Sequence, residues 1–556
     1  MAAAETWRGQ DPDVETKAEL TALIERAVGG DQQIGIKTAA AELEDAFSGL
    51  LEFGTAGLRG RLGPGPNRMN RLVTAYAAAG IGDYLQQLAR LGTVFVSKTV
   101  LIGYDARHKS ADFARDSAEI LGGLGFHVLL TTRPVPTPVI AFGIRHLGGQ
   151  AGIVVTASHN PREDNGYKVY LGDGRQIVPP HEVRIAQGMN LAADQPLALL
   201  PRSTDHHQVG DELVAAYVDR VARVVGGAGP RELTWVHTSL HGVGAEVVRR
   251  VADRLGFAAP IEVAEQAEPD PDFPTVAFPN PEEPGALDLA MTLGTERGAD
   301  LIIANDPDAD RCAVALPDGL GGWRVLHDDE LGVLLGDYLL RRGVEGAYAT
   351  TVVSGTMLPK IAAAHGQPTA RTLTGFKWLA RVPGLAYGYE EALGYCCDPA
   401  AVADKDGISA AALVLAMAAE EKAASRTLAD RLDQLALQHG VHRSDQVSMR
   451  VDDLSLITRA MARLRAEPPA ELCGEPVEVI DYAEGVEGLP SADVIQFRGE
   501  TVTATVRPSG TEPKLKCYFE TRVAPNVTAR DLAGSQAEAA GMMARLRADL
   551  QAALGL

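Results

Sequence analysis

The sequence predicts an α/β protein built from three or four domains. The chain has 556 residues, 46% of them hydrophobic, and this length is too great for one hydrophobic core. Up to about residue 440, short apolar runs alternate with helical stretches, which is typical of largely parallel sheets covered by helices. From about Val441, strands with alternating apolar residues indicate a smaller α+β domain.

The first domain is expected over residues 1–205, and its first 50 residues are expected to form a leading arm of polar helices. A glycine-rich segment starts at Phe53. Thr137 is expected to cap a later helix, with Pro138 at the first helical position. The other elements expected here are helices at 72–91 and Ala111–Leu124, and strands at Val100–Gly103, Phe126–Thr131 and from Ala151.

Three further domains are expected over residues 206–325, 326–440 and 441–556. Their boundaries follow from changes in the strand and helix pattern and from glycines and prolines near residue 440. The expected strands are Leu233–Thr238, 259–264, Asp300–Ala304, Ala347–Val353, Leu385–Tyr389, Val447–Val451, Val502–Val506 and Leu515–Thr521. The expected helices include Ala245–Leu255, Leu454–Leu464 and Ala529–Leu554.

The apolar run that starts at Ala151 ends abruptly in polar residues at Ser158. Such a run reads as a buried strand, and the following Asn160-Pro161 reads as a turn, so Ser158 should lie on a loop at the carboxyl end of the strand. Open α/β sheets bind their ligands at this edge. An acyl-transfer serine is disfavoured because the nucleophile-elbow motif of hydrolases is absent from the sequence around Ser158.

Three aspartates, Asp306, Asp308 and Asp310, occupy alternate positions directly after another buried strand. They would repel one another unless a cation gathers them, and oxygen-only ligands suit Mg²⁺ or Ca²⁺. The pattern is not an EF-hand, because Arg311 stands where that loop has glycine and Pro317 where it has its last glutamate. A solvated acidic loop would give the same pattern. A phosphate carried by Ser158 would be a suitable further ligand.

Three weaker segments suggest anion and sugar binding. Arg59 and Arg61 lie among glycines, which would let backbone amides and the two guanidinium groups approach one anion. The same segment could instead be a turn-rich connector with solvated arginines. Near the C-terminus, one arginine, two hydroxyls, a glycine and two lysines make a compact phosphate cradle or a polar hairpin. The paired carboxylates Glu390 and Glu391 could accept sugar hydroxyls, act in acid/base catalysis or be solvated. The cradle residues are Arg507, Ser509, Gly510, Thr511, Lys514 and Lys516.

Charge and composition bear on several classes of partner. The net charge of −21 argues against a nucleic-acid or anionic-membrane partner. The N-terminus lacks an apolar signal region and no stretch is long enough to span a bilayer, so the protein is expected in the cytoplasm. The five cysteines lack metal-ligand spacing, and reduced thiols are expected.

In this order, the serine loop, aspartate loop, sugar loop and phosphate cradle resemble those of the α-D-phosphohexomutase superfamily, the phosphoglucomutases and phosphomannomutases. The resemblance covers nearly the whole chain after Phe53. It implies four domains around a central cleft, three α/β and a smaller α+β one. It further implies that Ser158 is phosphorylated in the active form, that Mg²⁺ binds at Ser158 and the three aspartates, and that the protein is a monomer or homodimer.

The resemblance also implies a reaction. A hexose 1-phosphate would take a phosphoryl group from Ser158 on its 6-hydroxyl, turn over as a bisphosphate such as glucose 1,6-bisphosphate, and return its other phosphate to Ser158. Lys168 matches the general acid/base position, with Arg59 and Arg311 expected to lower its pKa. Arg59 and His159 match catalytic positions. Ligand contacts are implied for Arg311, Lys377, Glu390, Glu391, Lys405, Arg507, Ser509, Gly510 and Thr511.

The sugar is the least determined part of this hypothesis. Ala392 and Tyr395 depart from residues common in better-known members, and the glycine-rich segment resembles a branch that includes bacterial α-phosphoglucomutases and animal phosphopentomutases. Glucose is the expected hexose, with mannose second. The alternatives are a phosphopentomutase acting on ribose phosphates, a glucose 1,6-bisphosphate synthase, a silent metabolite-binding relative and a metallophosphatase.

Overall fold

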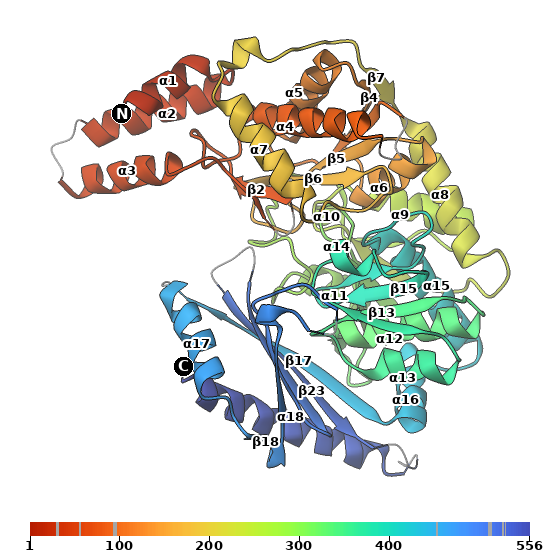
Figure 1. Cartoon of the computed structure of the whole chain (residues 1–556). Coiled ribbons are helices and arrows are strands. Elements are labelled where there is room, and N and C mark those ends of the chain that lie inside the picture. Colours follow the sequence, from red (N-terminus) through yellow and green to blue (C-terminus); the bar gives the residue numbers. More distant parts are fainter. Residues whose placement is uncertain are drawn as a thin grey trace. The chain divides into compact units, whose positions relative to one another are not determined.

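The structure is a computed structural model of the whole chain (Figure 1). It describes all residues except 29–32, 55–56, 93–96, 452–453, 487, 510–513, 525–527, 529 and 556, and the side chains of 33–36 and 454 are likewise left aside. The described chain forms two compact units. The first contains Met1–Gly227, Thr234–Cys312 and Ala400–Ile408, and the second contains Ala228–Leu233, Ala313–Pro399 and Ser409–Leu556.

The first unit begins with the expected arm of helices, α1 (Ala2–Gln10), α2 (Val14–Val28) and α3 (Gln33–Ala46). The arm has a small core of its own, which includes Leu20, Leu23 and Leu43. Trp7 joins it to the domain that follows, because its ring lies edge-on to Tyr76 at 6.4 Å between centroids. The prediction of a leading helical arm is therefore confirmed.

A mixed seven-stranded sheet follows in the order β1-β2-β6-β5-β3-β4-β7. Strands β3, β4, β5 and β7 are parallel, and β1, β2 and β6 pair antiparallel at one edge. The strands are β1 (Phe53–Gly54), β2 (Gly57–Arg61), β3 (Thr99–Tyr104), β4 (His127–Thr131), β5 (Ala151–Val155), β6 (Asp164–Leu171) and β7 (His207–Val209).

Helices cover both faces of this sheet (Figure 1). One face carries a large core formed with α4 (Arg71–Arg90), α5 (Ser110–Gly123) and α7 (His181–Ala193). The other face lies against α6 (Thr137–His146), whose Ile140 and Ile144 occupy the space above Gly103 and Gly152. Helix α8 (Asp211–Val225) packs beside α6. The alternation of strands and helices in the sequence is thus confirmed.

The helix-cap prediction at Thr137 is wrong by one position. Pro136 is the N-cap residue of α6, and Thr137 and Pro138 are its first two residues. The Thr137 hydroxyl does not cap the helix but donates to Asp308 Oδ2 at 2.6 Å. A threonine at this place is typical of a helix cap, and the sequence does not show that its hydroxyl instead contacts Asp308, 171 residues away.

The first unit also holds three parallel strands in the order β9-β8-β10, and β10 ends at the aspartate loop. Gly256 ends α9 in the left-handed conformation at φ +80°, as expected for a C-terminal glycine cap. The elements are β8 (Trp235–Thr238), α9 (Ala245–Leu255), β9 (Ile261–Glu262), α10 (Ala264–Ala267), α11 (Asp288–Arg297) and β10 (Leu301–Ala304).

The second unit contains a hairpin and a four-stranded sheet in the order β14-β13-β15-β16. The first three strands of the sheet are parallel and β16 is antiparallel. The hairpin is β11 (Ala313–Pro317) and β12 (Trp323–Val325), and the sheet strands are β13 (Ala347–Thr351), β14 (Thr369–Thr372), β15 (Leu385–Glu390) and β16 (Gly394–Cys396). The helices are α12 (Asp328–Arg341), α13 (Met357–Ala364), α14 (Phe376–Leu379) and α16 (Leu428–His439), while α15 (Gly407–Ala423) begins in the first unit.

The last part of the second unit is an antiparallel sheet in the order β17-β23-β22-β21-β20. Helices α17 (Leu454–Ala466) and α18 (Leu532–Leu554) pack on it with a shared apolar core, which confirms the predicted α+β character. The strands are β17 (Val441–Arg450), β20 (Glu478–Asp481), β21 (Ile495–Arg498), β22 (Val502–Pro508) and β23 (Lys514–Val523), with a small hairpin of β18 (Glu471–Leu472) and β19 (Glu475–Pro476).

Two general features follow from the described residues. None of the helices they form combines the length and apolar character needed to cross a membrane. The five cysteines form no disulfide bond, and four of them are buried while Cys473 is partly exposed.

Candidate functional site

Ser158 lies at the carboxyl end of β5, as predicted. Its backbone is in the left-handed region at φ +54°, and its amide donates to Thr156 Oγ1 at 2.8 Å. The residue is 1% exposed. A non-glycine residue in this conformation is held there by its surroundings, a feature that clusters at functional sites.

The aspartate loop presents its three carboxylates to the serine. Asp306, Asp308 and Asp310 are each fully buried directly after β10. Ser158 Oγ donates to Asp306 Oδ2 at 2.7 Å. Burial, followed by the charges of Asp308 and Asp310, raises the pKa of Asp306 well above its usual value. The structure therefore brings the predicted serine and aspartates together.

These carboxylates fit a hard divalent cation. Their ligand atoms lie within 4.8 Å of one another, and Asp308 Oδ1 and Asp310 Oδ1 are buried without a hydrogen-bond partner. Buried carboxylate oxygens without a donor are costly, and a cation that takes oxygen ligands would satisfy them. Asp306, Asp308, Asp310 and Ser158 are the residues that would hold it.

Lys168 lies on β6 and is 2% exposed. Its Nζ donates to Asp308 Oδ2 at 2.6 Å and to Asp310 Oδ2 at 2.7 Å. Burial acts to lower the pKa of Lys168 and so does Arg59, but the two carboxylates outweigh both and raise the pKa above its usual value. Arg59 therefore acts on the pKa of Lys168 in the expected direction, but the two carboxylates outweigh it and the net pKa is not lowered.

Arg59 and His159 flank the serine from two directions. Arg59, on β2, donates from Nη1 to Asn160 Oδ1 at 3.3 Å, and its Nε is buried without an acceptor. His159 Nδ1 lies 3.2 Å from Ser158 Oγ. Burial, then the charges of Arg311 and Arg59, lowers the pKa of His159 well below its usual value, so the ring is neutral near pH 7. The glycine-rich segment is thus more than a connector.

Two further predicted ligands reach the aspartates. Arg311 Nε lies 3.8 Å from Asp306 Oδ2 and 3.9 Å from Asp310 Oδ1. Lys405 Nζ lies 3.4 Å from Asp310 Oδ2. Lys405 belongs to the segment Ala400–Ile408, which packs within the first unit although it follows the sheet of the second. These cations partly offset the charge of the three carboxylates.

Arg107, which binds the backbone of the serine loop, was not identified from the sequence. Its guanidinium donates to the carbonyl oxygens of Ser158, Asn160 and Pro161 at 2.6, 2.5 and 2.7 Å, and to that of Asp164 at 3.2 Å. Arg107 is 4% exposed. Its place shortly after the buried strand β3 could have suggested a role at the site. Its acceptors are backbone carbonyl oxygens, which no sequence motif identifies.

In the second unit, Glu390 and Glu391 lie at the turn between β15 and β16. The turn contains Ala392 and Leu393 in the left-handed region at φ +72° and +62°. Glu391 Oε2 accepts from the Thr351 hydroxyl at 3.0 Å and Oε1 from the Tyr518 hydroxyl at 3.3 Å. Burial raises the pKa of Glu391 to about 7, with Arg507 opposing and Glu390 assisting the shift.

Arg507 of the predicted cradle lies beside this turn. Its Nη1 donates to the Thr374 hydroxyl, and the neighbouring Gly375 amide donates to Glu390 Oε2 at 2.9 Å. Lys377, two residues further, stands over the ring of Trp378 with Nζ 5.7 Å from its centroid. The structure thus connects Glu390, Arg507 and the segment of Lys377.

Of the remaining cradle residues, Ser509, Lys514 and Lys516 fall in the described part, the two lysines on β23. The Ser509 amide donates to the Lys514 carbonyl at 2.8 Å, which links the end of β22 to the start of β23. The expected contacts of Gly510 and Thr511 lie outside the described residues.

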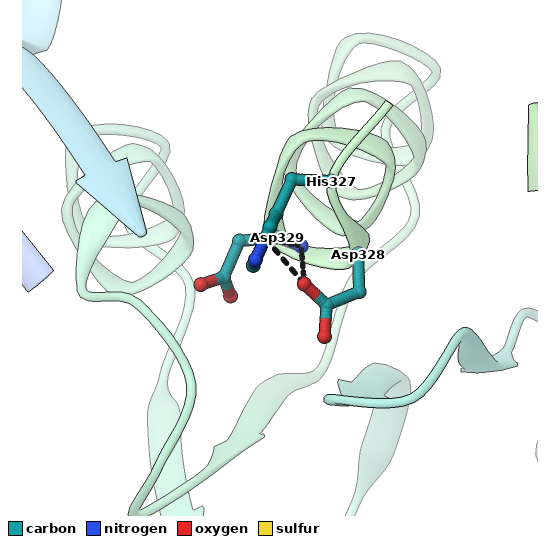
Figure 2. A group of neighbouring side chains, drawn as sticks. All are labelled: His327, Asp328 and Asp329. Carbon is teal, nitrogen blue, oxygen red and sulfur yellow. Dashed lines mark hydrogen bonds and ion pairs between the residues drawn. The ribbon is translucent and has the colours of Figure 1, made fainter. Parts of the chain in front are cut away.

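A second group of potential metal ligands, His327, Asp328 and Asp329, lies at the start of α12 (Figure 2). Figure 2 shows His327 and the Asp329 amide directed at one oxygen of Asp328. The other Asp328 oxygen accepts from the Ala392 amide at 3.0 Å. Asp329 accepts from the Gly355 amide at 2.9 Å and from the Tyr389 hydroxyl at 2.5 Å. These carboxylates are already satisfied, and they hold the Glu390–Ala392 turn rather than offering a metal centre.

Family models match the chain in four consecutive regions. They are phosphoglucomutase/phosphomannomutase alpha/beta/alpha domains I, II and III, over residues 50–195, 215–319 and 327–436, and the C-terminal domain of the same family over 449–533. The four-domain α/β architecture is therefore shown. The domain boundaries expected from the sequence stay predictions.

Several curated proteins are similar over most of the chain. A probable phosphomannomutase of Haemophilus influenzae is 44% identical over 82% of this chain and 93% of its own length. The human phosphopentomutase is 34% identical over 86% of each chain. A phosphoglucomutase of Staphylococcus epidermidis is 33% identical over 86% of this chain and 92% of its own.

Mutases of this kind are isomerases that move a phosphoryl group within a sugar phosphate. The relatives carry three different sugar names, so the similarity indicates the type of reaction without selecting the sugar. In the first unit, Ser158 lies beside three buried carboxylates whose ligand atoms are within 4.8 Å of one another. The chain belongs to the phosphoglucomutase/phosphomannomutase family, the α-D-phosphohexomutase superfamily.

Proposed function

We propose that this protein is a Mg²⁺-dependent phosphohexomutase that interconverts the 1- and 6-phosphates of glucose, with mannose as the second hexose. The observation that carries the proposal is the buried hydrogen bond from Ser158 Oγ to Asp306, beside Asp308 and Asp310. It supports Ser158 as the phosphoryl carrier. A serine phosphate at this place would lie next to cationic groups, namely Arg311 and Arg59, and to the neutral His159.

In the proposed reaction, the phosphoryl group on Ser158 passes to the free 6-hydroxyl of a hexose 1-phosphate. The bond from phosphorus to Ser158 Oγ breaks, a bond to the sugar oxygen forms, and the hydroxyl proton leaves. The resulting glucose 1,6-bisphosphate turns over and returns its 1-phosphate to Ser158, which releases the 6-phosphate. The same bisphosphate, added in trace amounts, would phosphorylate any unmodified Ser158.

We propose Lys168 as the group that moves the proton. It is buried beside the serine loop, and its pKa is raised by Asp308 and Asp310. When bound, Mg²⁺ would offset these carboxylates and stabilise the charge of the transferring phosphoryl oxygens. With the carboxylates offset, Arg59 and Arg311 would then favour the neutral amine on Lys168.

Recognition of the sugar phosphate is assigned to the second unit. Arg507 and Ser509 would hold the phosphate that does not react, and Glu390 and Glu391 would accept sugar hydroxyls. Lys377 of the second unit and Lys405 of the first unit would each add a cationic contact. The fixed turn at Glu390, held by the Gly375 amide and by Asp328, supports this assignment because an acceptor in a defined place can select among hydroxyls.

A phosphopentomutase is the second candidate, favoured by the 34% identity to the human phosphopentomutase. The deciding experiment is steady-state isomerisation of glucose, mannose and ribose 1-phosphates with Mg²⁺ and a trace of the bisphosphate. The proposal expects the highest kcat/KM with glucose 1-phosphate. A far higher value with ribose 1-phosphate would replace the hexose by the pentose.

The matched control is Ser158→Ala, which keeps the loop and removes only the carrier oxygen. It should lose isomerase activity by a factor of at least about 10³, as expected when a covalent intermediate cannot form. Wild-type activity in this variant would exclude the proposed mechanism.

A further inference from the structure

The second unit contains a cavity of about 380 Å³ that is separate from the sugar and phosphate residues. Its walls come from the loop after β13, from β14 and α13, and from the segment around Tyr482 and the strand β21. The residues that matter below are two arginines, Arg371 and Arg498, and the partly apolar surface of Val352, Pro359, Tyr482 and Leu489. Glu390, Glu391 and Arg507 do not line it.

Arg371 brings a guanidinium group into this cavity that has no ion-pair partner among the described residues. Its Nη2 donates to the carbonyl oxygen of Val352 at 3.0 Å, and more weakly to those of Thr351 and Ser354 at 3.5 Å. Its Nε is buried without an acceptor. Within the described part of the chain no carboxylate forms an ion pair with it. Burial lowers the pKa of Arg371 and the charge of Arg498 adds to the fall, whereas the charge of Glu520 opposes it.

Arg498, at the end of β21, also lines the cavity and is linked to the same carbonyl oxygen through Gln496. Its Nη2 donates to Gln496 Oε1 at 2.9 Å, and Gln496 Nε2 donates to the Val352 carbonyl at 2.7 Å. The two guanidinium groups are therefore held near each other through Val352 and Gln496. Among the described residues Arg498 has no ion-pair partner either, so two like charges face the cavity together.

Two neighbouring guanidinium groups without ion-pair partners are costly, because each loses hydration and repels the other. A dianion that both can contact removes the repulsion and satisfies the unused N–H donors. Guanidinium groups match phosphate geometry with paired hydrogen bonds, and the cavity is of the size usual for small-molecule sites. The apolar part of the wall would cover a carbon skeleton attached to that phosphate.

We propose that this cavity is a second ligand site, which binds a small phosphate monoester through Arg371 and Arg498 and packs its apolar or aromatic body against Val352, Pro359 and Leu489. The site uses none of the residues assigned to catalysis. It does not depend on which sugar the enzyme isomerises.

The test is isothermal titration calorimetry of the full chain with phenyl phosphate and with inorganic phosphate, in the presence of a chelator. The protein carries Arg507→Gln and Ser509→Ala, which remove phosphate binding at the proposed substrate site. Phenyl phosphate should bind at one site, about tenfold more tightly than inorganic phosphate, because only the ester covers the apolar wall. Equal or tighter binding of inorganic phosphate would contradict the predicted ester, and absence of saturation at millimolar phenyl phosphate would overturn the site.

Two variants and one control locate the binding. Arg371→Gln with Arg498→Gln should weaken phenyl phosphate at least tenfold, whereas Arg297→Gln, an arginine on α11 outside the cavity, should leave it unchanged. Thr369→Glu, at the exposed rim of the cavity, places a carboxylate near the arginines. It should weaken phenyl phosphate at least tenfold and raise the Tm, even if the double variant folds poorly. Unchanged affinity in Thr369→Glu would contradict the proposal.

Discussion

Ser158 Oγ donates a hydrogen bond of 2.7 Å to Asp306 Oδ2, although 148 residues separate the two in the sequence. The bond exists because β5 and β10, two buried strands of the first unit, each end in a polar loop whose residues adopt a left-handed turn, at Ser158 and at Ala309. The bond joins the proposed phosphoryl carrier to the proposed metal ligands. Three predictions concern this arrangement in the first unit, and a fourth concerns Glu391 in the second unit.

Asp306→Asn should lower activity and raise stability at the same time. The carboxylate is buried against two others, which raises its pKa, so a neutral amide removes repulsion in the protein without a cation. We expect the Tm in chelator to rise by about 2 °C or more and kcat/KM to fall by about 10³-fold. Thermal unfolding and the isomerase assay measure the two effects. A lower Tm in chelator would show that the carboxylates do not repel one another as inferred.

Lys168→Met should make the protein depend on Mg²⁺ for its stability. Without the ammonium group, the carboxylates of Asp308 and Asp310 stay buried without their ion pairs, which costs about 3 kcal/mol or more. Added Mg²⁺ should recover more stability in the variant than in the wild type, because it replaces the missing charge. The measurement is unfolding by urea with Mg²⁺ and with chelator. An equal Mg²⁺ effect in both proteins would argue against a cation at these aspartates.

Arg107→Met should destabilise the serine loop. It removes donors to four buried or half-buried carbonyl oxygens, a loss of about 2–4 kcal/mol. The loop should then be cleaved faster by protease under native conditions, and kcat should fall while the affinity for Mg²⁺ changes little. Arg133→Met is the matched control, because Arg133 pairs with the partly exposed Glu246 outside this loop. Equal protease sensitivity in both variants would contradict the role of Arg107.

The sequence was sufficient to locate the main elements of the site. The strands ending at Ser158 and before Asp306 could be predicted because buried strands have an apolar composition and end at polar turns. The meeting of these two loops could be expected only from the family resemblance. The helical arm, the largely parallel sheets and the last α+β domain were predictable for a similar reason, because the spacing of apolar residues differs between helices and strands.

What the sequence did not reveal depends on contacts between remote residues. Arg107 acts through backbone carbonyls, which every residue has, so no motif marks its partners. The pKa of Lys168 was expected to fall because Arg59 and Arg311 were expected in the same pocket. The sequence does not show that Lys168 also contacts Asp308 and Asp310, whose charges raise its pKa. Likewise, nothing in the local sequence shows that Lys405, next to Asp404, reaches Asp310.

Glu391 should impose a pH dependence near neutrality on both stability and sugar binding. Burial raises its pKa to about 7 from a usual value of 4.5, so between these pH values the native protein holds a proton that the unfolded chain has lost. Stability therefore falls as pH rises from about 4.5 through 7, on the order of 3 kcal/mol for this group, and levels off about one pH unit above 7. Glu391→Gln, which keeps the shape and cannot ionise, should remove this fall.

The same variant tests the proposed role in sugar recognition. An ionised Glu391 accepts sugar hydroxyls more strongly than the neutral acid, so the KM of the wild type for glucose 1-phosphate should decrease as pH rises through 7. In Glu391→Gln the KM should be higher, by about tenfold, and should lose this step, while the Ser158-dependent kcat changes less. Glu475→Gln is the control, because Glu475 accepts from Thr501 in the same unit, away from Arg507 and Glu390. A KM step near pH 7 that persists in Glu391→Gln would assign it to another group.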